Sequence, residues 1–342
     1  MKKPTQVPIP SRGRGWRTVA LTLLIPVSLW TVAALGLDMK PTWARSLAVA
    51  GYLGMVGALF VSVQNSWRRL GPWLALNVLV IVWWLNLKPS ANENWAPEFA
   101  RQAWSEQTGE RVTIHDVRNF TYRTETDFTV NWETRTIDLS QIQGADLFLT
   151  HWGVPLIAHS MVSFRFADGT YLATSIEARR TVNQEFSALR GFFRQFQVSY
   201  LISDERDVVR LRTNYRHDEE VYLYRTRLKP ADARALFQSY LGWMNAARAR
   251  PQWYNALTRN CSTPITIYLA KTGVGGISRW DLRGVLDGSG DKMLYELGDL
   301  VGDNLPFAEL KRQAWINPAA HAADTASDFS QKIRANRAGF GP

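Results

Sequence analysis

The chain contains a single cysteine, Cys261, whose surroundings favour a chemical role. It lies in the run YNALTRNCS (residues 254–262), shortly before Pro264 and an apolar stretch that ends at Gly273. A proline near the start and a glycine just past the end are typical of a short helix. A thiol at a helix N-terminus lies at the positive end of the helix dipole, which favours the nucleophilic thiolate. The alternative is a buried, inert side chain, because free cysteines are among the most buried residues.

A cysteine nucleophile needs a base, and five histidines are available. His321 lies in the polar C-terminal tail, His217 lies in the charged run RHDEE, and His115 lies in an alternating strand pattern. The remaining two, His151 and His159, lie in HWGVPLIAHSMVSF, where His159 begins a predicted strand. A histidine fixed on a sheet can reach a thiol at a helix N-terminus, so we predict His159 as the base, with His151 as the second candidate. The alternative is that His159 only forms hydrogen bonds within a half-buried strand.

A third polar group usually orients the imidazole of such a pair. If the turn at 167–169 is a three-residue loop, Glu177 comes opposite His159 and Ser175 is a diagonal neighbour on the same face. A two-residue loop would place Ala178 there instead and turn Glu177 to the other face. The run SIEARR, which contains both polar candidates, is equally compatible with a structural corner held by salt bridges.

Further polar support could come from the residues around the thiol itself. Asn260 directly precedes Cys261, and the backbone N–H of Cys261 or Ser262 could donate to an oxyanion. The histidines are scattered, the cysteine is single, and no ligand spacing such as HExxH occurs. We therefore expect neither a metal nor a cofactor.

The first quarter of the chain predicts a membrane anchor. Three long uncharged stretches, 18–37, 46–67 and 70–87, each have about the length that an apolar helix needs to cross a bilayer. Residues 1–17 carry five basic side chains, and Arg68 and Arg69 follow the second stretch, whereas the loop after the first is poorer in positive charge. The positive-inside rule then places the basic N-terminus (1–17) in the cytoplasm and everything after residue 88 outside. The first stretch is too long for a signal-peptide core, so we expect an uncleaved anchor of three transmembrane helices over 18–88.

The net charge of +10 comes almost entirely from this anchor. Residues 1–88 hold ten Lys or Arg and one Asp, whereas the rest of the chain holds 30 basic and 29 acidic residues. The excess charge therefore orients a membrane protein, and we do not expect nucleic-acid binding.

Residues 89–315 predict one α+β domain outside the membrane. Helical spacing occurs at 95–106 and 230–248, and strand patterns occur at 111–124, 128–139, 146–152, 157–166, 171–177, 195–203, 208–213 and 220–227. The tail at 316–342 is rich in Ala, Ser, Asp and Gln, which predicts poor order.

The order of these features, a histidine on a strand and a distant Asn-Cys that opens a helix, resembles the permuted papain-like group that includes the lecithin:retinol acyltransferase family. The chain is more closely similar to the Lnb N-terminal periplasmic domain family. That resemblance is carried by VTIHDVRNFTYRTETDF, DLFLTHWGVPLIAHSMVSFRFADGTYL, SIEARR, RDVVRLRTNYR and YNALTRNCSTPI, which appear in order and are spread over most of residues 95–275.

This family is associated with bacterial lipoprotein N-acylation by a cysteine–histidine mechanism. The resemblance therefore implies a papain-like domain of the circularly permuted type, with Cys261 as nucleophile and His159 as base. It implies a multi-pass protein of the bacterial inner membrane whose periplasmic domain moves an acyl chain from a phospholipid, through a thioester, to an amine such as the N-terminus of a lipoprotein. Two other classes stay open: a Cys–His cell-wall peptidase or amidase, and a non-catalytic binding protein tethered to the membrane.

Overall fold

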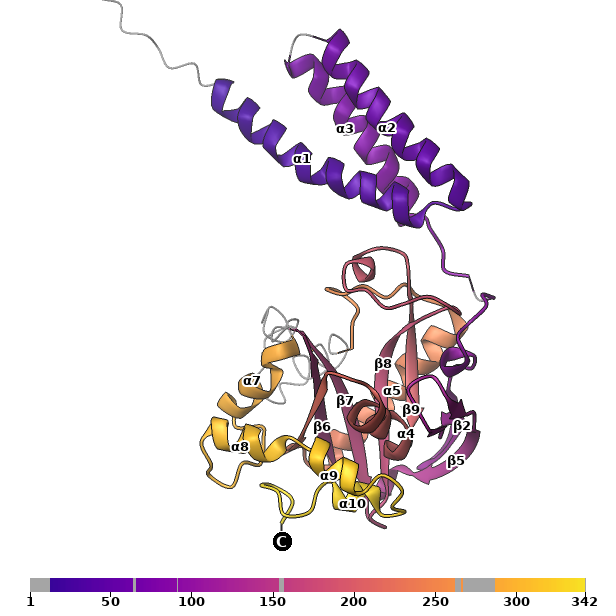
Figure 1. Cartoon of the computed structure of the whole chain (residues 1–342), viewed down its shortest axis with the longest axis vertical. Helices are drawn as coiled ribbons and strands as arrows, with labels where there is room; N and C mark the ends of the chain where they lie inside the picture. Colours follow the sequence, from indigo (N-terminus) through magenta and orange to yellow (C-terminus); the bar gives the residue numbers. More distant parts are fainter. Residues whose placement is uncertain are drawn as a thin grey trace, which may run out of the picture. The chain divides into compact units, whose positions relative to one another are not determined.

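The computed structural model describes residues 13–63, 66–90, 92–153, 157–261, 266 and 287–341 (Figure 1). The chain divides into two compact units. One comprises Met1–Lys88 together with Phe193–Gln195, and the other comprises Pro89–Phe192 and Phe196–Pro342.

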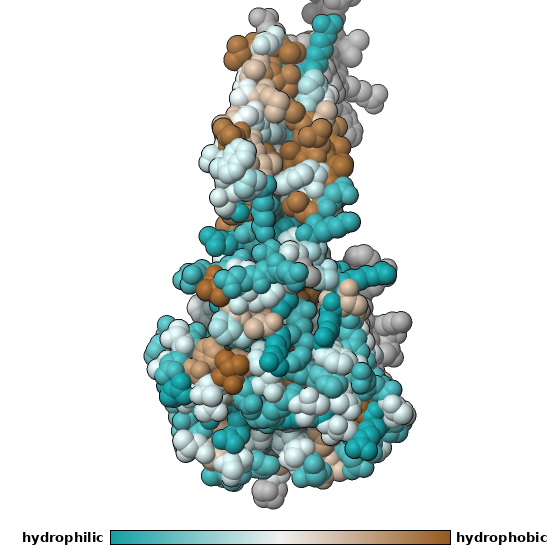
Figure 2. All heavy atoms as spheres, turned by 90° about the vertical axis from the view of Figure 1, so that its right-hand side faces the viewer, coloured by the Kyte–Doolittle hydropathy of each residue, from teal (hydrophilic) through white to brown (hydrophobic). Residues whose placement is uncertain are grey.

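The first unit consists of three helices, α1 (Gly13–Asp38), α2 (Thr42–Ser62) and α3 (Ser66–Leu85). Its interior holds polar groups, because the Asn77 side-chain oxygen accepts hydrogen bonds from Thr31 Oγ1 at 2.7 Å and from Tyr52 Oη at 3.1 Å. Each helix contributes one of these three residues. Figure 2 shows apolar patches, in brown, on the visible face of this unit among paler and teal residues. Several large apolar side chains of the unit are more than 60% exposed: Leu23, Leu29, Leu47, Val61, Leu79 and Leu85.

Within the described residues, α2 is the one helix that is long and apolar enough to cross a membrane by length and composition. The apolar part of α1, Thr22–Asp38, is shorter, and α3 begins with the run Ser66–Leu70 that contains Arg68 and Arg69. The prediction of three transmembrane helices is therefore supported for one helix and stays a prediction for the other two.

The second unit is built on an eight-stranded mixed sheet with the order β1-β2-β9-β8-β7-β6-β10, in which β5 also pairs with β2. All of these pairings are antiparallel except that of β2 with β9. The strands of this sheet are β1 (Trp104–Thr108), β2 (Arg111–Arg118), β5 (Trp132–Asp138), β6 (Ile142–Trp152), β7 (Ala158–Phe166), β8 (Tyr171–Arg179), β9 (Gln197–Ser203) and β10 (Glu219–Arg225). A separate two-stranded ribbon is formed by β3 (Thr121–Tyr122) and β4 (Phe128–Thr129).

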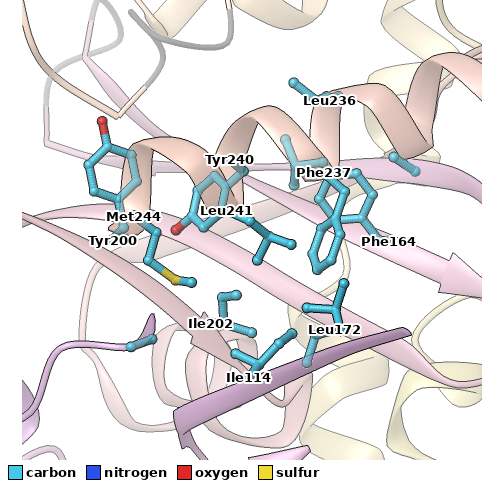
Figure 3. Close-up of a cluster of buried hydrophobic side chains, with 14 of the residues drawn as sticks. Ile114, Phe164, Leu172, Tyr200, Ile202, Leu236, Phe237, Tyr240, Leu241 and Met244 are labelled. Atoms are coloured by element: carbon cyan, nitrogen blue, oxygen red, sulfur yellow. The ribbon is translucent and has the colours of Figure 1, made fainter. Parts of the chain in front are cut away.

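Helices cover both faces of this sheet, so the predicted α+β class is confirmed. On one face lies α5 (Pro230–Ala249), where the Phe237 ring packs against Phe164 with centroids 4.7 Å apart (Figure 3). On the other face Met161 packs with residues of α4 (Glu205–Arg210), α9 (Asn317–Ala322) and α10 (Phe329–Lys332). Two further helices, α7 (Gly290–Glu296) and α8 (Phe307–Ala314), bury Met293 and Leu310.

Residues 316–341 are folded, so the prediction of poor order for the tail at 316–342 is wrong over the described part of it. Ala320 of α9, Phe329 of α10 and the following Ile333 are buried in the core cluster beneath the sheet. The buried Arg334 forms ion pairs at 2.9 Å with Asp146 and at 2.7 Å with Glu205. The tail is mostly polar in composition, and its few buried apolar and charged residues are not evident from that composition. Because these residues pack in the core, the domain continues past residue 315 through the described residues.

Two predicted elements also differ in type. The stretch 208–213, with its paired valines, indicated a strand, but it forms α4 and the π-helical turn η4 (Leu211–Tyr215). The Asp204 side chain starts this helix by accepting a hydrogen bond from Arg206 N at 3.0 Å, and such N-caps override β propensity. Residues 95–106 were expected to be helical, but they form the short η1 (Pro97–Phe99) and the start of β1.

Candidate functional site

The hairpin between β7 and β8 determines which polar side chains meet. Phe166 N donates to Thr170 O at 3.0 Å, and Gly169 closes the turn with φ of 82°, which glycine adopts without strain. The loop therefore has three residues, as one of the two predicted registers requires. The register pairs Met161 with Ser175, and two positions farther along it places His159 opposite Glu177.

Three side chains of this hairpin form a connected hydrogen-bond group. His159 Nε2 lies 2.8 Å from Ser175 Oγ and 3.1 Å from Glu177 Oε1, and Ser175 Oγ donates to Glu177 Oε1 at 2.7 Å. Because the Ser175 hydroxyl donates its hydrogen bond to the carboxylate, its oxygen can accept a hydrogen bond from Nε2–H. The imidazole is therefore held as the Nε2–H tautomer, and Nδ1 carries the lone pair. Among the described residues, no hydrogen bond engages Nδ1.

A residue that the sequence did not indicate completes the group. Arg212, on η4, donates from Nη2 to Glu177 Oε1 at 3.2 Å and from Nη1 to Glu219 Oε2 at 3.1 Å. The guanidinium is buried, at 5% exposure, and is held between two carboxylates. It therefore holds the Glu177 carboxylate at Oε1, the same oxygen that lies 3.1 Å from the imidazole. The sequence pattern at 208–213 predicted a strand and therefore did not indicate that Arg212 contacts Glu177. A buried carboxylate beside a histidine nevertheless needs such a cation.

The electrostatics of the group keep Glu177 ionised and His159 neutral. Burial alone would raise the pKa of Glu177, but the neighbouring His159 and Arg212 and the hydrogen bond from Ser175 lower this pKa well below its usual value. Burial is the main cause that lowers the pKa of His159 below 6.5, and the positive charge of Arg212 lowers it further, whereas Glu177 raises it. A neutral imidazole beside an ionised carboxylate is the resting state that a general base requires.

One cavity of about 930 Å³ is lined both by residues of the hairpin group and by the cysteine. His159, Glu177 and Arg212 line it together with Asn260 and Cys261. The cysteine is 5% exposed and also packs in the core cluster beneath α5. Asn260 donates from Nδ2 to Ala256 O at 2.9 Å, so this amide braces the loop that leads to the thiol. Ser262 and the helix predicted to follow it lie outside the described residues.

The other histidines occupy different places. The ring of His151 packs edge-on against Tyr222 with centroids 5.5 Å apart, and burial lowers the pKa of His151, but this residue does not line the cavity. His115 stacks on Trp104 with centroids 4.0 Å apart, also away from the cavity. His217, considered a solvated loop residue from the sequence, does line the cavity. Of the two candidates in HWGVPLIAHSMVSF, only His159 therefore lies at this site.

The chemistry available at the site is that of a thiol, an oriented imidazole and an ionised carboxylate. Within the described residues, no group of three or more His, Cys, Asp or Glu side chains is placed to hold a metal ion. A thiol and a neutral imidazole are the groups that nucleophilic attack on a carbonyl carbon uses, and both line this cavity.

Comparisons with known proteins give one match. No curated protein and no solved structure matches the chain. The family described as Lnb N-terminal periplasmic domain matches residues 128–286, a span that contains the hairpin group, Arg212 and Cys261. This match confirms the resemblance predicted from the sequence motifs. Residues 128–286 of this chain therefore belong to the Lnb N-terminal periplasmic domain family.

Proposed function

We propose that this chain is a membrane-anchored periplasmic cysteine acyltransferase. It would move an acyl chain from a phospholipid, through a thioester on Cys261, to an amine such as the N-terminus of a lipoprotein. The observation that carries the proposal is the hydrogen-bonded group His159, Ser175 and Glu177 on the wall of a cavity that Cys261 also lines. The association of the matched family with lipoprotein N-acylation supports this choice of reaction.

The first step is activation of the thiol. His159 Nδ1 takes the proton of Cys261, while Nε2–H keeps its contacts with Ser175 and Glu177. The imidazolium formed in this way lies beside an ionised carboxylate, which stabilises the new positive charge. Arg212 keeps that carboxylate in place and unprotonated.

The acyl transfer then proceeds in two balanced halves. The Cys261 thiolate attacks the ester carbonyl carbon of a phospholipid, forming a C–S bond and an oxyanion. Collapse of this intermediate breaks the bond to the glycerol oxygen, which takes the proton from His159 Nδ1 and leaves as lysophospholipid. An acceptor amine next attacks the thioester and loses a proton to His159, and the returning thiolate is reprotonated as the amide departs.

The lining of the cavity supports a lipid donor. Apolar side chains that are also exposed contribute to it: Ile157, Val182, Phe186, Phe192 and Leu257. A site for a hydrated glycopeptide would expose mainly polar groups, whereas an acyl chain is stabilised by apolar contacts. The described lining therefore favours phospholipid over cell-wall peptide.

The helical unit supports an anchor in the inner membrane with three crossings. Helix α2 has the length and composition of a membrane span. The buried contacts of Asn77 with Thr31 and Tyr52 join α3 to α1 and α2, while the outer side chains are apolar. Polar groups inside and apolar groups outside are the arrangement that a bilayer stabilises. The basic N-terminus then lies in the cytoplasm and the sheet domain in the periplasm.

Transfer to an amine can be tested directly. The purified full chain is incubated with phospholipid and a synthetic diacylated lipopeptide that has a free N-terminal amine, and the products are resolved by mass spectrometry. We expect N-acylated lipopeptide and lysophospholipid in equal amounts, no product with Cys261→Ala, and unchanged turnover with His115→Ala, a histidine outside the cavity. Release of free fatty acid without acylated peptide would identify a hydrolase, and intact phospholipid would exclude the acyltransferase.

A further inference from the structure

Exposed apolar side chains gather at one part of the periplasmic domain. We call this surface the apolar rim and define it as Ile157, Val182, Phe186, Leu189, Phe192 and Leu257. Leu189 is 68% exposed and Leu257 is 49% exposed. All members except Leu189 also line the cavity that holds Cys261. Single exposed apolar residues are common, but a group of them around the opening of one cavity indicates an interaction site.

The rim is joined to the loop that carries the nucleophile. Ala256 N donates to Gly191 O at 2.8 Å, and Asn255 Nδ2 donates to Phe192 O at 3.3 Å. The two segments approach so closely at Gly191 that an added Cβ would lie 3.3 Å from Ala256 Cβ and 3.4 Å from Tyr254 Cε1. The rim and the residues leading to Cys261 therefore form one connected piece of structure.

The segment that carries most of the rim also holds one exposed cation, Arg190, and one exposed anion, Glu185. Arg190 is exposed and lies in the segment between Leu189 and Phe192, both of which are exposed. Large apolar side chains with an interspersed arginine are typical of segments that bury their apolar groups at the acyl boundary and keep the cation among anionic headgroups. Because Glu185 balances the charge of Arg190, it is the apolar surface that favours a phospholipid bilayer as the partner.

The short connector between the two units keeps the sheet domain close to the bilayer in which the helical unit is proposed to lie. Helix α3 ends at Leu85 and η1 begins at Pro97, so residues 86–96 connect the two units. A connector of this length spans at most about 40 Å when fully extended. With α3 in the membrane, a bilayer is the apolar surface that the domain always meets.

We propose that the apolar rim inserts into the periplasmic leaflet of the phospholipid bilayer and delivers an acyl chain from the leaflet to the cavity. This inference rests on the proposed membrane anchoring and phospholipid donor, and it names the surface through which the donor enters. An acyl chain that passes along the rim stays in apolar surroundings, which avoids the cost of exposing each methylene to water.

Photolabelling from within the bilayer tests this proposal without requiring turnover. The full chain is reconstituted in vesicles of phosphatidylethanolamine and phosphatidylglycerol that contain a phosphatidylcholine with a diazirine at the end of one acyl chain. After irradiation, peptides are mapped by mass spectrometry. We expect labels within residues 182–192 and near Leu257, in addition to the membrane helices. Leu189→Gln combined with Phe192→Gln should lower the rim label about tenfold.

A matched control is provided by Leu297→Gln, because Leu297 is 40% exposed but lies outside the cavity lining. It should leave the rim label unchanged. Labels confined to the helical unit, or equal labelling around Leu297 and the rim, would overturn the proposal. Rim labelling without an acyl adduct on Cys261 would support membrane insertion of the rim and contradict the proposed acyltransferase activity. An acyl adduct on Cys261 without rim labelling would support the acyltransferase activity and contradict insertion of the rim.

Discussion

Glu177 Oε1 lies 3.1 Å from His159 Nε2, at positions that the β7–β8 hairpin register places opposite each other. This contact determines which nitrogen of the imidazole is free, because Nε2–H is held by the carboxylate. The contact also helps to keep Glu177 negatively charged, because the Glu177 pKa is lowered well below its usual value. Nδ1 is therefore the atom that can act as a base toward a thiol.

Loss of the Glu177 charge should slow thioester formation and move its pH dependence. Glu177→Gln keeps the shape of the side chain but removes the negative charge that stabilises the imidazolium, so we expect a decrease of at least about 100-fold. Because Glu177 raises the pKa of His159, its removal lowers that pKa further. The acid limb of the rate profile should move to lower pH. Stopped acylation reactions between pH 4.5 and 8 measure both effects, and an unchanged rate would contradict the assigned role.

Loss of the Arg212 charge should move the acid limb in the opposite direction. Arg212 lowers the pKa of His159, so Arg212→Gln raises it and the rate should begin to fall at higher pH than in the unmodified protein. The matched control is Arg101→Gln, which removes an exposed arginine that pairs with Asp116 at 3.2 Å. A shift to lower pH with Arg212→Gln, or the same shift with Arg101→Gln, would contradict the account.

Removal of the Ser175 hydroxyl should have a smaller effect. Ser175 connects His159 and Glu177 by contacts of 2.8 and 2.7 Å, but the direct contact between those two residues remains in Ser175→Ala. The loss of one buried hydrogen bond to a charged group corresponds to about 1.5–3 kcal/mol, or about tenfold to 100-fold in rate. Steady-state assays should show this decrease in kcat with little change in KM. A larger loss than with Glu177→Gln would exclude a purely positioning role.

The C-terminal tail should be essential for stability. Arg334→Ala leaves the buried carboxylates of Asp146 and Glu205 without their shared partner, which should lower the free energy of unfolding by about 3–5 kcal/mol. Lys332→Ala removes an exposed pair with Asp328 and should leave the free energy of unfolding nearly unchanged. Chemical denaturation of the full chain in detergent measures the difference. Equal effects of the two substitutions would show that the tail does not hold the core together.

The sequence was most informative where local signals coincide. The turn at 167–169 ends in glycine and restricts the hairpin register, so a contact between His159 and Glu177 followed as one of two alternatives. The apolar stripe of α5 likewise predicted a helix over 230–248, close to its observed bounds of Pro230–Ala249.

Features that depend on distant partners could not be predicted in this way. Arg212 meets Glu177 across 35 positions of the chain, from a turn whose valine-rich start indicated a strand. Arg334 meets Asp146 across 188 positions, and nothing in its polar neighbourhood indicates that it is buried. In both cases the tertiary contact, not the local pattern, determines the structure.

The central claim is that the Cys261 thiol carries the acyl chain, and the intact mass of the protein tests it most directly. The chain has one cysteine, so an adduct that hydroxylamine removes is a thioester on Cys261. After incubation with phospholipid and no acceptor, we predict a mass increase of one acyl group, its removal by hydroxylamine, and its absence in Cys261→Ala. An unmodified mass, while the same thiol still reacts with a small alkylating reagent, would contradict the account.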